Sequence, residues 1–176
     1  MKKVALIVVM MCSILFANAQ SVFDKFESKE GVSTVVVSKK MFEMMSKIKV
    51  DSKDKETQTY MNLLKNLDNL KVFATDNTAI ATEMKNSFAS YLKTNPLEEL
   101  MRASNEGRKV NIYVKSGSSE NIVKELLMLI DAPNEKENKS VILSLTGNFN
   151  LDDISMLTEK LSIPGGEELK KASKKK

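Results

Sequence analysis

The sequence predicts an α+β fold with a single mixed, largely antiparallel sheet of about five strands and helices packed mainly on one face. Three observations support this prediction. Short β-branched runs alternate with amphipathic segments in the first two thirds of the folded chain. Three runs of alternating hydrophobicity then follow one another, separated only by turn residues. A capped amphipathic segment closes the chain, so helices and a meander are expected to share one sheet.

The first elements of the folded chain are expected to be a helix, a strand and a helix. Phe23 and Phe26 lie at helical spacing and predict a short helix over 21–30. The β-branched run VSTVVV predicts a strand over 32–37. Ser38 is expected to cap the next helix. The apolar face of that helix is formed by Met41, Phe42, Met45 and Ile48.

The next stretch is expected to hold a helix, a strand and a long helix. Leucines at helical spacing predict a helix over 57–67, and the alternating run LKVFAT predicts a strand over 70–75. Asp76 or Thr78 is expected to cap the long helix, which ends near Lys93. Its inward positions are Ile80, Met84, Phe88 and Tyr91 or Leu92.

One further helix is expected to begin at Pro96, because proline is favoured at the first helical position. Three apolar residues follow at the spacing of one helix face. These residues are Leu97, Leu100 and Met101. The helix is expected to end near Gly107.

The last third of the chain is expected to form a meander and a closing helix. Alternation predicts strands over 110–115 and 140–146. The segment 121–131 fits both a strand and a helix by periodicity. We favour the strand because turn residues flank the segment and another strand follows. Asn150 is expected to cap the last helix, with Asp153 at its third position.

The first 19 residues have the parts of an export signal. Two lysines form a positive n-region, and an apolar run of 13 residues follows at 4–16. Ala17 and Ala19 place small residues at both positions that a signal peptidase reads, so cleavage leaves Gln20 as the new N-terminus. A membrane-spanning helix needs about 20 apolar residues, so this run is too short to span and no transmembrane segment is expected in the mature chain. The predicted location is the periplasm or the outer membrane.

The single cysteine, Cys12, raises the alternative of a lipoprotein signal. Such a signal requires a small residue before the cysteine, and Met11 stands there. The apolar run also continues beyond Cys12 to Phe16. We therefore favour simple cleavage, which removes the only thiol and leaves a chain that can form no disulfide.

The mature chain is expected to consist of one domain over 20–166 and a Lys-rich disordered tail over 167–176. The net charge of the full chain is +4, but two of its 27 basic residues lie in the signal and five near the C-terminus. The remaining 20 are outnumbered by 23 acidic residues, so no nucleic-acid partner is expected. A weak contact between the tail and an anionic membrane surface remains open.

Several motifs, taken in order, resemble a family of small exported bacterial proteins known as a domain of unknown function, number 4252. They are Phe23 and Phe26, a valine strand leading into SKKMF at 38–42, ELLML at 125–129, and LSLTGNFNLDDIS at 143–155. The resemblance spans nearly the whole mature chain and implies that ELLML pairs as a strand with the segment before LTG. Many members look like lipoproteins, and this chain differs in the residue before its cysteine. The family has no established activity, so it implies no catalytic residue.

The composition argues against most enzyme classes. The sequence has no histidine, which removes the side chain best suited to proton transfer at neutral pH. Without a cysteine in the mature chain, zinc and iron–sulfur sites are not expected either. Neither Ser–His nor Cys–His nucleophiles can be built, and no Gly-rich phosphate loop is present. We expect no catalytic residue, no cofactor and no metal.

Weaker candidates each have a simpler structural explanation. Three Ser-x-x-Lys spacings are expected by chance in a Lys-rich chain. They are Ser46/Lys49, Ser52/Lys55 and Ser173/Lys176. Three methionines, Met41, Met44 and Met45, could bind Cu(I). Met41 and Met45, however, share a helix face with Phe42 and Ile48 and are better explained as core residues.

Acidic clusters are likewise expected to be structural. Two acidic loops lack EF-hand spacing and are interleaved with lysine, so solvated loops are expected. They contain Asp51, Asp54 and Glu56 in one and Asp131, Glu135 and Glu137 in the other. The pair Asp152 and Asp153 is explained by its place at a helix start.

The sequence therefore predicts a non-catalytic exported binding or accessory protein, whose partner is an envelope protein or a lipid. One alternative is a carrier that holds a small apolar ligand or lipid between sheet and helices. The other is a hydrolase that uses carboxylates or a Ser–Lys pair. The residues themselves name no ligand and no reaction.

Overall fold

The computed structural model describes most of the chain after the expected signal. The described residues are 22–48, 54–105, 107–119, 121–134, 136, 139–160, 167 and 169–170. The predicted cleavage residues Ala17, Ala19 and Gln20, and also Cys12, lie outside them.

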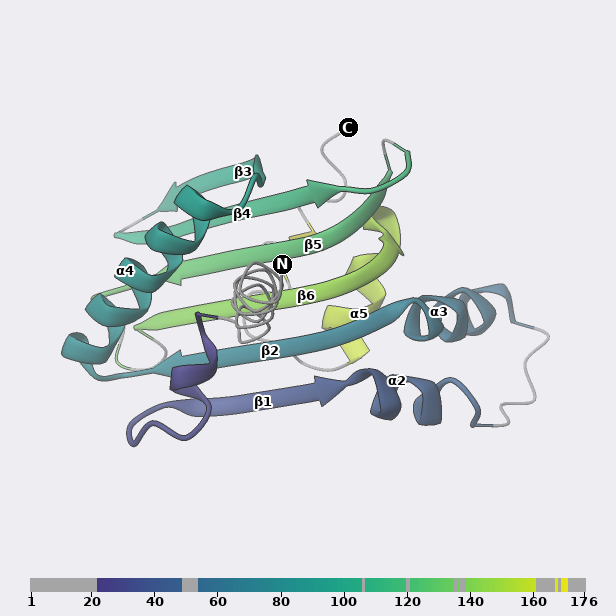
Figure 1. Cartoon of the computed structure of the whole chain (residues 1–176), viewed down its shortest axis with the longest axis horizontal. Helices are drawn as coiled ribbons and strands as arrows, with labels where there is room; N and C mark the ends of the chain where they lie inside the picture. Colours follow the sequence, from purple (N-terminus) through teal and green to yellow (C-terminus); the bar gives the residue numbers. More distant parts are fainter. Residues whose placement is uncertain are drawn as a thin grey trace, which may run out of the picture.

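One antiparallel sheet organises the molecule, which confirms the predicted α+β class, with six strands instead of about five. The strands are β1 (Ser33–Ser38), β2 (Leu67–Thr75), β3 (Glu98–Asn105), β4 (Arg108–Ser116), β5 (Ile122–Asp131) and β6 (Ser140–Asn150). Their order across the sheet is β1-β2-β6-β5-β4-β3, so β1 and β3 form its two edges (Figure 1). Every neighbouring pair is antiparallel.

Helices cover both faces of the sheet, whereas the sequence predicted them mainly on one face. They are η2 (Asp24–Phe26), α2 (Lys39–Met45), α3 (Lys55–Lys65), α4 (Thr78–Thr94), η3 (Leu151–Asp153) and α5 (Ile154–Lys160). The buried side chains of α2, α3 and α5 join one core cluster, whereas α4 and the segment at η2 join the other. We call these two sides the α3 face and the α4 face. In Figure 1 the long helix α4 crosses in front of the sheet.

Strand β5 explains how one sheet supports two cores. Leu126 and Met128 point to the α3 face, and Leu127 and Leu129 point to the α4 face. All four are at most 6% exposed. A strand that is buried on both faces has an almost continuous apolar sequence. Periodicity alone therefore could not distinguish a strand from a helix in this segment. The pairing of β5 with both β4 and β6 confirms the strand.

The helix predicted from Pro96 is wrong, because this segment is the edge strand β3. A register irregularity between Glu99 and Met101 interrupts the alternation. As a result Leu100 and Met101, which are neighbours in sequence, both pack against the core of the α3 face. This β-bulge reproduces the apolar spacing of a helix, and that coincidence misled the sequence interpretation. A turn at Gly107, with a φ of 88°, then leads into β4.

The predicted helix caps agree only in part with the structure. The cap of α4 is Asn77, and neither Asp76 nor Thr78, since the Asn77 side chain accepts hydrogen bonds from the amides of Ala79 and Ile80. Ser38 is at the cap position of α2 but makes no capping side-chain bond. Asn150 does cap the next segment, which begins as the short 3-10 helix η3.

The two ends of the domain also differ from expectation. The predicted helix over 21–30 is reduced to the single turn η2, although Phe23 and Phe26 are buried as expected. Leu169 falls in the expected disordered tail but is 1% exposed and belongs to the core of the α3 face. Leu169 itself therefore packs against the domain.

Candidate interaction surface

Strand β1 forms an edge of the sheet that no other strand of the described part of the chain covers. Its sequence, STVVVS, contains no charged residue. Val35 and Val36 are 54% and 45% exposed although they lie within a regular strand. An edge strand carries unpaired backbone N–H and C=O groups, and exposed apolar side chains make such an edge ready to pair with another strand.

The two exposed valines lie on opposite faces of the sheet. Val35 is paired with Val72, which belongs to the core of the α3 face. Val36 is paired with Lys71, which contacts Asp24 and Glu27 on the α4 face. Directly opposite residues of antiparallel strands point to the same face, so β1 exposes a valine on each side.

Helix α2 extends this apolar edge beyond the end of β1. Phe42 is fully buried and Met45 packs against the core, so α2 has the inward side that the sequence predicted. Its other predicted core residues, Met41 and Ile48, are instead 50% and 62% exposed, and Met44 is 58% exposed. Met41 and Met44 lie on α2, which ends at Met45, and Ile48 lies in the turn just after the helix, so the three exposed residues follow one another along this segment.

The position of α2 in the fold explains why these residues are exposed. The helix follows the outermost strand and packs against β1, β2 and α3, so no element covers its outer side among the described residues. Figure 1 shows α2 continuing the line of β1 at the sheet edge. We call the exposed set the β1–α2 surface. It consists of Val35, Val36, Met41, Met44 and Ile48.

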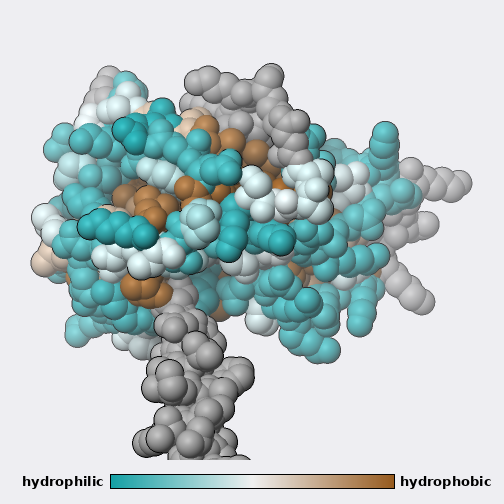
Figure 2. All heavy atoms as spheres, turned by 45° about the horizontal axis from the view of Figure 1, so that its top comes forward, coloured by the Kyte–Doolittle hydropathy of each residue, from teal (hydrophilic) through white to brown (hydrophobic). Residues whose placement is uncertain are grey.

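The opposite edge of the sheet has the protection that β1 lacks. Strand β3 carries Glu98, Glu99 and Arg102, and Arg102 forms a salt bridge with Glu99. The β-bulge further breaks the regular ladder that a second strand would need. Figure 2 brings this side of the molecule forward and shows mainly hydrophilic residues, with apolar patches between them. The contrast singles out β1 as the edge available for pairing.

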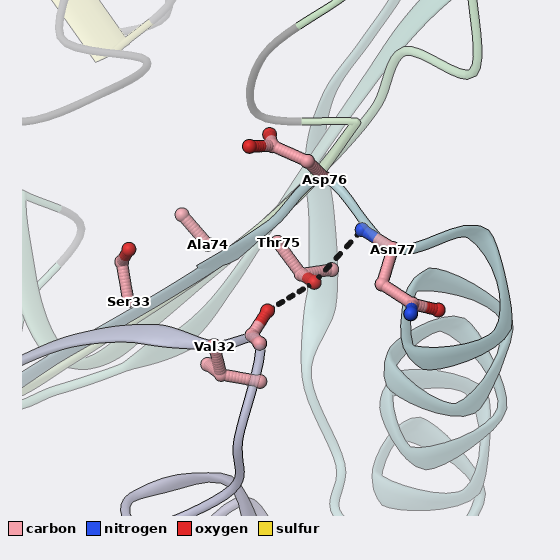
Figure 3. Close-up of a pocket in the computed structure, with 7 residues that line it drawn as sticks. Val32, Ser33, Ala74, Thr75, Asp76 and Asn77 are labelled. Carbon is pink, nitrogen blue, oxygen red and sulfur yellow. Dashed lines mark hydrogen bonds between the residues drawn. The ribbon is translucent and has the colours of Figure 1, made fainter.

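A hollow of about 440 Å³ lies where β1 and β2 meet the start of α4. The Thr75 hydroxyl donates to the carbonyl of Gly31 at 2.6 Å and accepts from the amide of Asn77 at 3.1 Å (Figure 3). Ser33 and Asp76 complete the largely polar lining, together with Val32 and Ala74. These contacts join the start of β1 to the start of α4. The lining is more polar than an apolar ligand or lipid would require.

A polar pair also lies within the core of the α4 face. The Tyr91 hydroxyl donates to Glu125 at 2.6 Å, and Glu125 is only 8% exposed. Burial, this hydrogen bond and the charge of Glu125 raise the pKa of Tyr91 well above its usual range. The phenol therefore keeps its proton and serves as a donor that satisfies a buried carboxylate.

The weaker sequence candidates are structural wherever the chain is described. Asp54 caps α3, and the bonds from Thr57 and Glu56 lower its pKa. Asp131 pairs with Lys85, and Ser46 donates to the carbonyl of Glu43. Further residues of the Ser-x-x-Lys and acidic-loop candidates lie outside the described part of the chain. They are Lys49, Asp51, Ser52, Glu135, Glu137, Ser173 and Lys176.

Other candidates also belong to local structure. Burial and the neighbouring Asp152 raise the pKa of Asp153, the last residue of η3. Within the described residues, no group of three or more Asp, Glu, His or Cys side chains is arranged to hold a metal ion. In the same part of the chain, no helix is both long and apolar enough to cross a bilayer.

The fold and this surface define a class of protein: a six-stranded antiparallel α+β domain with one unprotected sheet edge. A family model matches residues 26–157, which is most of the chain, and is described as a domain of unknown function, DUF4252. The chain belongs to this family, which confirms the resemblance of its motifs. Searches of curated proteins and of solved structures gave no match.

Proposed function

We propose that this protein is a non-catalytic exported accessory protein of the cell envelope that binds another protein chain through the β1–α2 surface. The observation that carries the proposal is an uncharged edge strand with exposed valines, followed by exposed apolar residues on α2 and in the turn after it. Exposed apolar side chains along an uncharged strand edge make that edge ready to pair with a strand of another chain.

The mode of binding follows from the kind of surface. A free strand edge offers backbone hydrogen bonds to an incoming strand, and alternate side chains then supply specificity. On this protein Val35 and Val36 would contact such a strand, one on each face of the sheet. Met41, Met44 and Ile48 add adaptable apolar contacts at one end.

Export is supported by the sequence of the first 19 residues, with a positive start, an apolar run and small residues at Ala17 and Ala19. The absence of histidine from the sequence supports a binding role over acid–base catalysis. The polar lining of the hollow near Thr75 favours a protein partner over a carried lipid.

Co-purification from an envelope extract tests this proposal. A tagged chain, expressed beside an untagged copy of the same chain, is isolated in its wild-type form and with Val36→Lys, which places a charge on the exposed edge. The matched control is Ala103→Lys, at an exposed position of the other edge strand, β3. We expect a protein in stoichiometric amount with the wild type and the control, and a loss of about tenfold with Val36→Lys, because a charge in an apolar contact is costly.

Two results would overturn the proposal. One is equal recovery of the protein partner with wild type and Val36→Lys. The other is stoichiometric lipid with no protein partner. The intact mass of the isolated chain also reports whether it begins at Gln20, as the export signal predicts.

A further inference from the structure

We propose that the chain bound at the β1–α2 surface is a second copy of this protein, joined by antiparallel pairing of the two β1 strands about a two-fold axis at Val36. This inference rests on the proposed function and names the partner of that surface. The two copies would share one continuous sheet across the axis.

The sequence of β1 is nearly the same in both directions, as self-pairing requires. With the axis at Val36, this valine faces its own copy and Val35 faces Val37 of the second copy. Thr34 faces Ser38 of the second copy. Facing residues in antiparallel strands share a side of the sheet, so valine meets valine and hydroxyl meets hydroxyl.

The neighbouring symmetric register is less favourable. An axis at Val35 would place Thr34 opposite Val36 and Ser33 opposite Val37 of the second copy. Each of these pairs sets a hydroxyl against an apolar side chain. The side-chain pattern therefore selects the register centred on Val36.

Charge placement also permits the pairing. Along the chain, the first charges after β1 are those of Lys39 and Lys40, which would face Ser33 and Val32 of the second copy. Lys71, opposite Val36 on β2, is bonded to Asp24 and Glu27 of its own chain. No two lysines meet across the axis, so the pairing brings no like charges face to face. Lys39 is in addition held by Asp68 within its own chain, at 2.8 Å.

The geometry limits assembly to two copies. A two-fold contact uses the same edge of both chains, so the pairing is closed and does not continue. The remaining edge of each copy is β3, whose charges and β-bulge oppose further strand addition. Because the strands are antiparallel, the two α2 helices lie at opposite ends of the paired strands and extend the apolar area there.

Sedimentation velocity of the purified exported chain tests the association. We expect a dimer for the wild type and for Ala103→Lys, and a midpoint of the monomer–dimer transition shifted by about tenfold or more for Val36→Lys. Far-ultraviolet circular dichroism checks that both variants keep the fold. A wild type that stays monomeric at all concentrations, or a dimer unaffected by Val36→Lys, would overturn the inference.

Disulfide trapping tests the register independently and with a milder substitution. After signal cleavage the chain contains no cysteine, so Val36→Cys and Val35→Cys each introduce a single thiol. Facing residues have Cβ atoms about 4.5–5.5 Å apart, close enough for a bridge to form with small adjustment. We expect a covalent dimer from Val36→Cys under mild oxidation and far less from Val35→Cys; the reverse result would contradict this register.

The outcomes separate this inference from the proposed function. A monomer whose Val36→Lys variant still loses an envelope partner overturns self-pairing and leaves the proposed function standing. A dimer that is insensitive to Val36→Lys, together with unchanged co-purification, contradicts both.

Discussion

Single residues show where this domain combines burial with polarity. Glu125 lies on β5 within an otherwise apolar stretch, and a buried carboxylate is costly unless it is hydrogen-bonded. Tyr91, which lies on α4, donates that hydrogen bond from its hydroxyl at 2.6 Å. The sequence predicted Tyr91 or Leu92 as an inward residue from helical spacing. It could not predict the partner, because β5 and α4 come together only in the folded chain.

Replacement of Tyr91 by phenylalanine tests the importance of this bond. Tyr91→Phe keeps the ring and its packing against Phe23, with centroids 5.2 Å apart, but removes the hydroxyl donor. We expect the free energy of unfolding to fall by about 1–3 kcal/mol, the usual cost of an unsatisfied buried group. Chemical denaturation measures it. Tyr113→Phe is the control, because its hydroxyl bonds the exposed Glu99, and it should change stability little.

At the scale of elements, a polar clamp fixes the N-terminal turn to the sheet. Lys71 on β2 donates to Asp24 at 2.5 Å and to Glu27 at 2.6 Å, and both acceptors belong to the segment around η2. Partial burial lowers the pKa of Lys71, but the bonds and charges of the two carboxylates outweigh it and leave the pKa raised. The clamp holds Phe26 against Phe73 beneath it.

This clamp predicts a specific loss of stability in alkaline solution. Because the folded pKa of Lys71 exceeds its ordinary value of 10.5, its contribution is fully present below that pH. The contribution is lost as the pH rises through the folded pKa. Unfolding of the wild type and Lys71→Met, followed by denaturant across this range, should show a difference at neutral pH that shrinks above about pH 10.5. A difference that stays constant would show that Lys71 acts through packing alone.

Elements with a regular pattern could be predicted from sequence, and irregular ones could not. The alternation in β4 and the helical spacing in α4 were sufficient, because each element keeps one orientation along its length. In β3 the bulge between Glu99 and Met101 places two consecutive residues on one side, which a period of two cannot represent. The two-sided burial of β5 removed its alternation in the same way, and only its flanking turns favoured a strand.

At the scale of the whole molecule, the candidate surface depends on which strand ends up at the sheet edge. The sequence identified β1 and α2 but assigned Met41 and Ile48 to the core, since amphipathic spacing does not reveal what lies opposite a helix. The strand order β1-β2-β6-β5-β4-β3 leaves the apolar VVV segment at one edge and the charged β3 at the other. The sequence did contain one sign of this exposed surface: the segment MFEMM at 41–45 has more apolar residues than the buried face of α2 requires.

The central claim is that the free edge of β1 pairs with another copy of the chain, and amide hydrogen exchange tests it most directly. Antiparallel pairing would give hydrogen-bond partners to those amides of β1 that do not bond β2. We predict that exchange within Ser33–Ser38 slows as the protein concentration rises, and that Val36→Lys abolishes this dependence. Exchange of β1 that is equally fast at every concentration, in both proteins, would contradict the account.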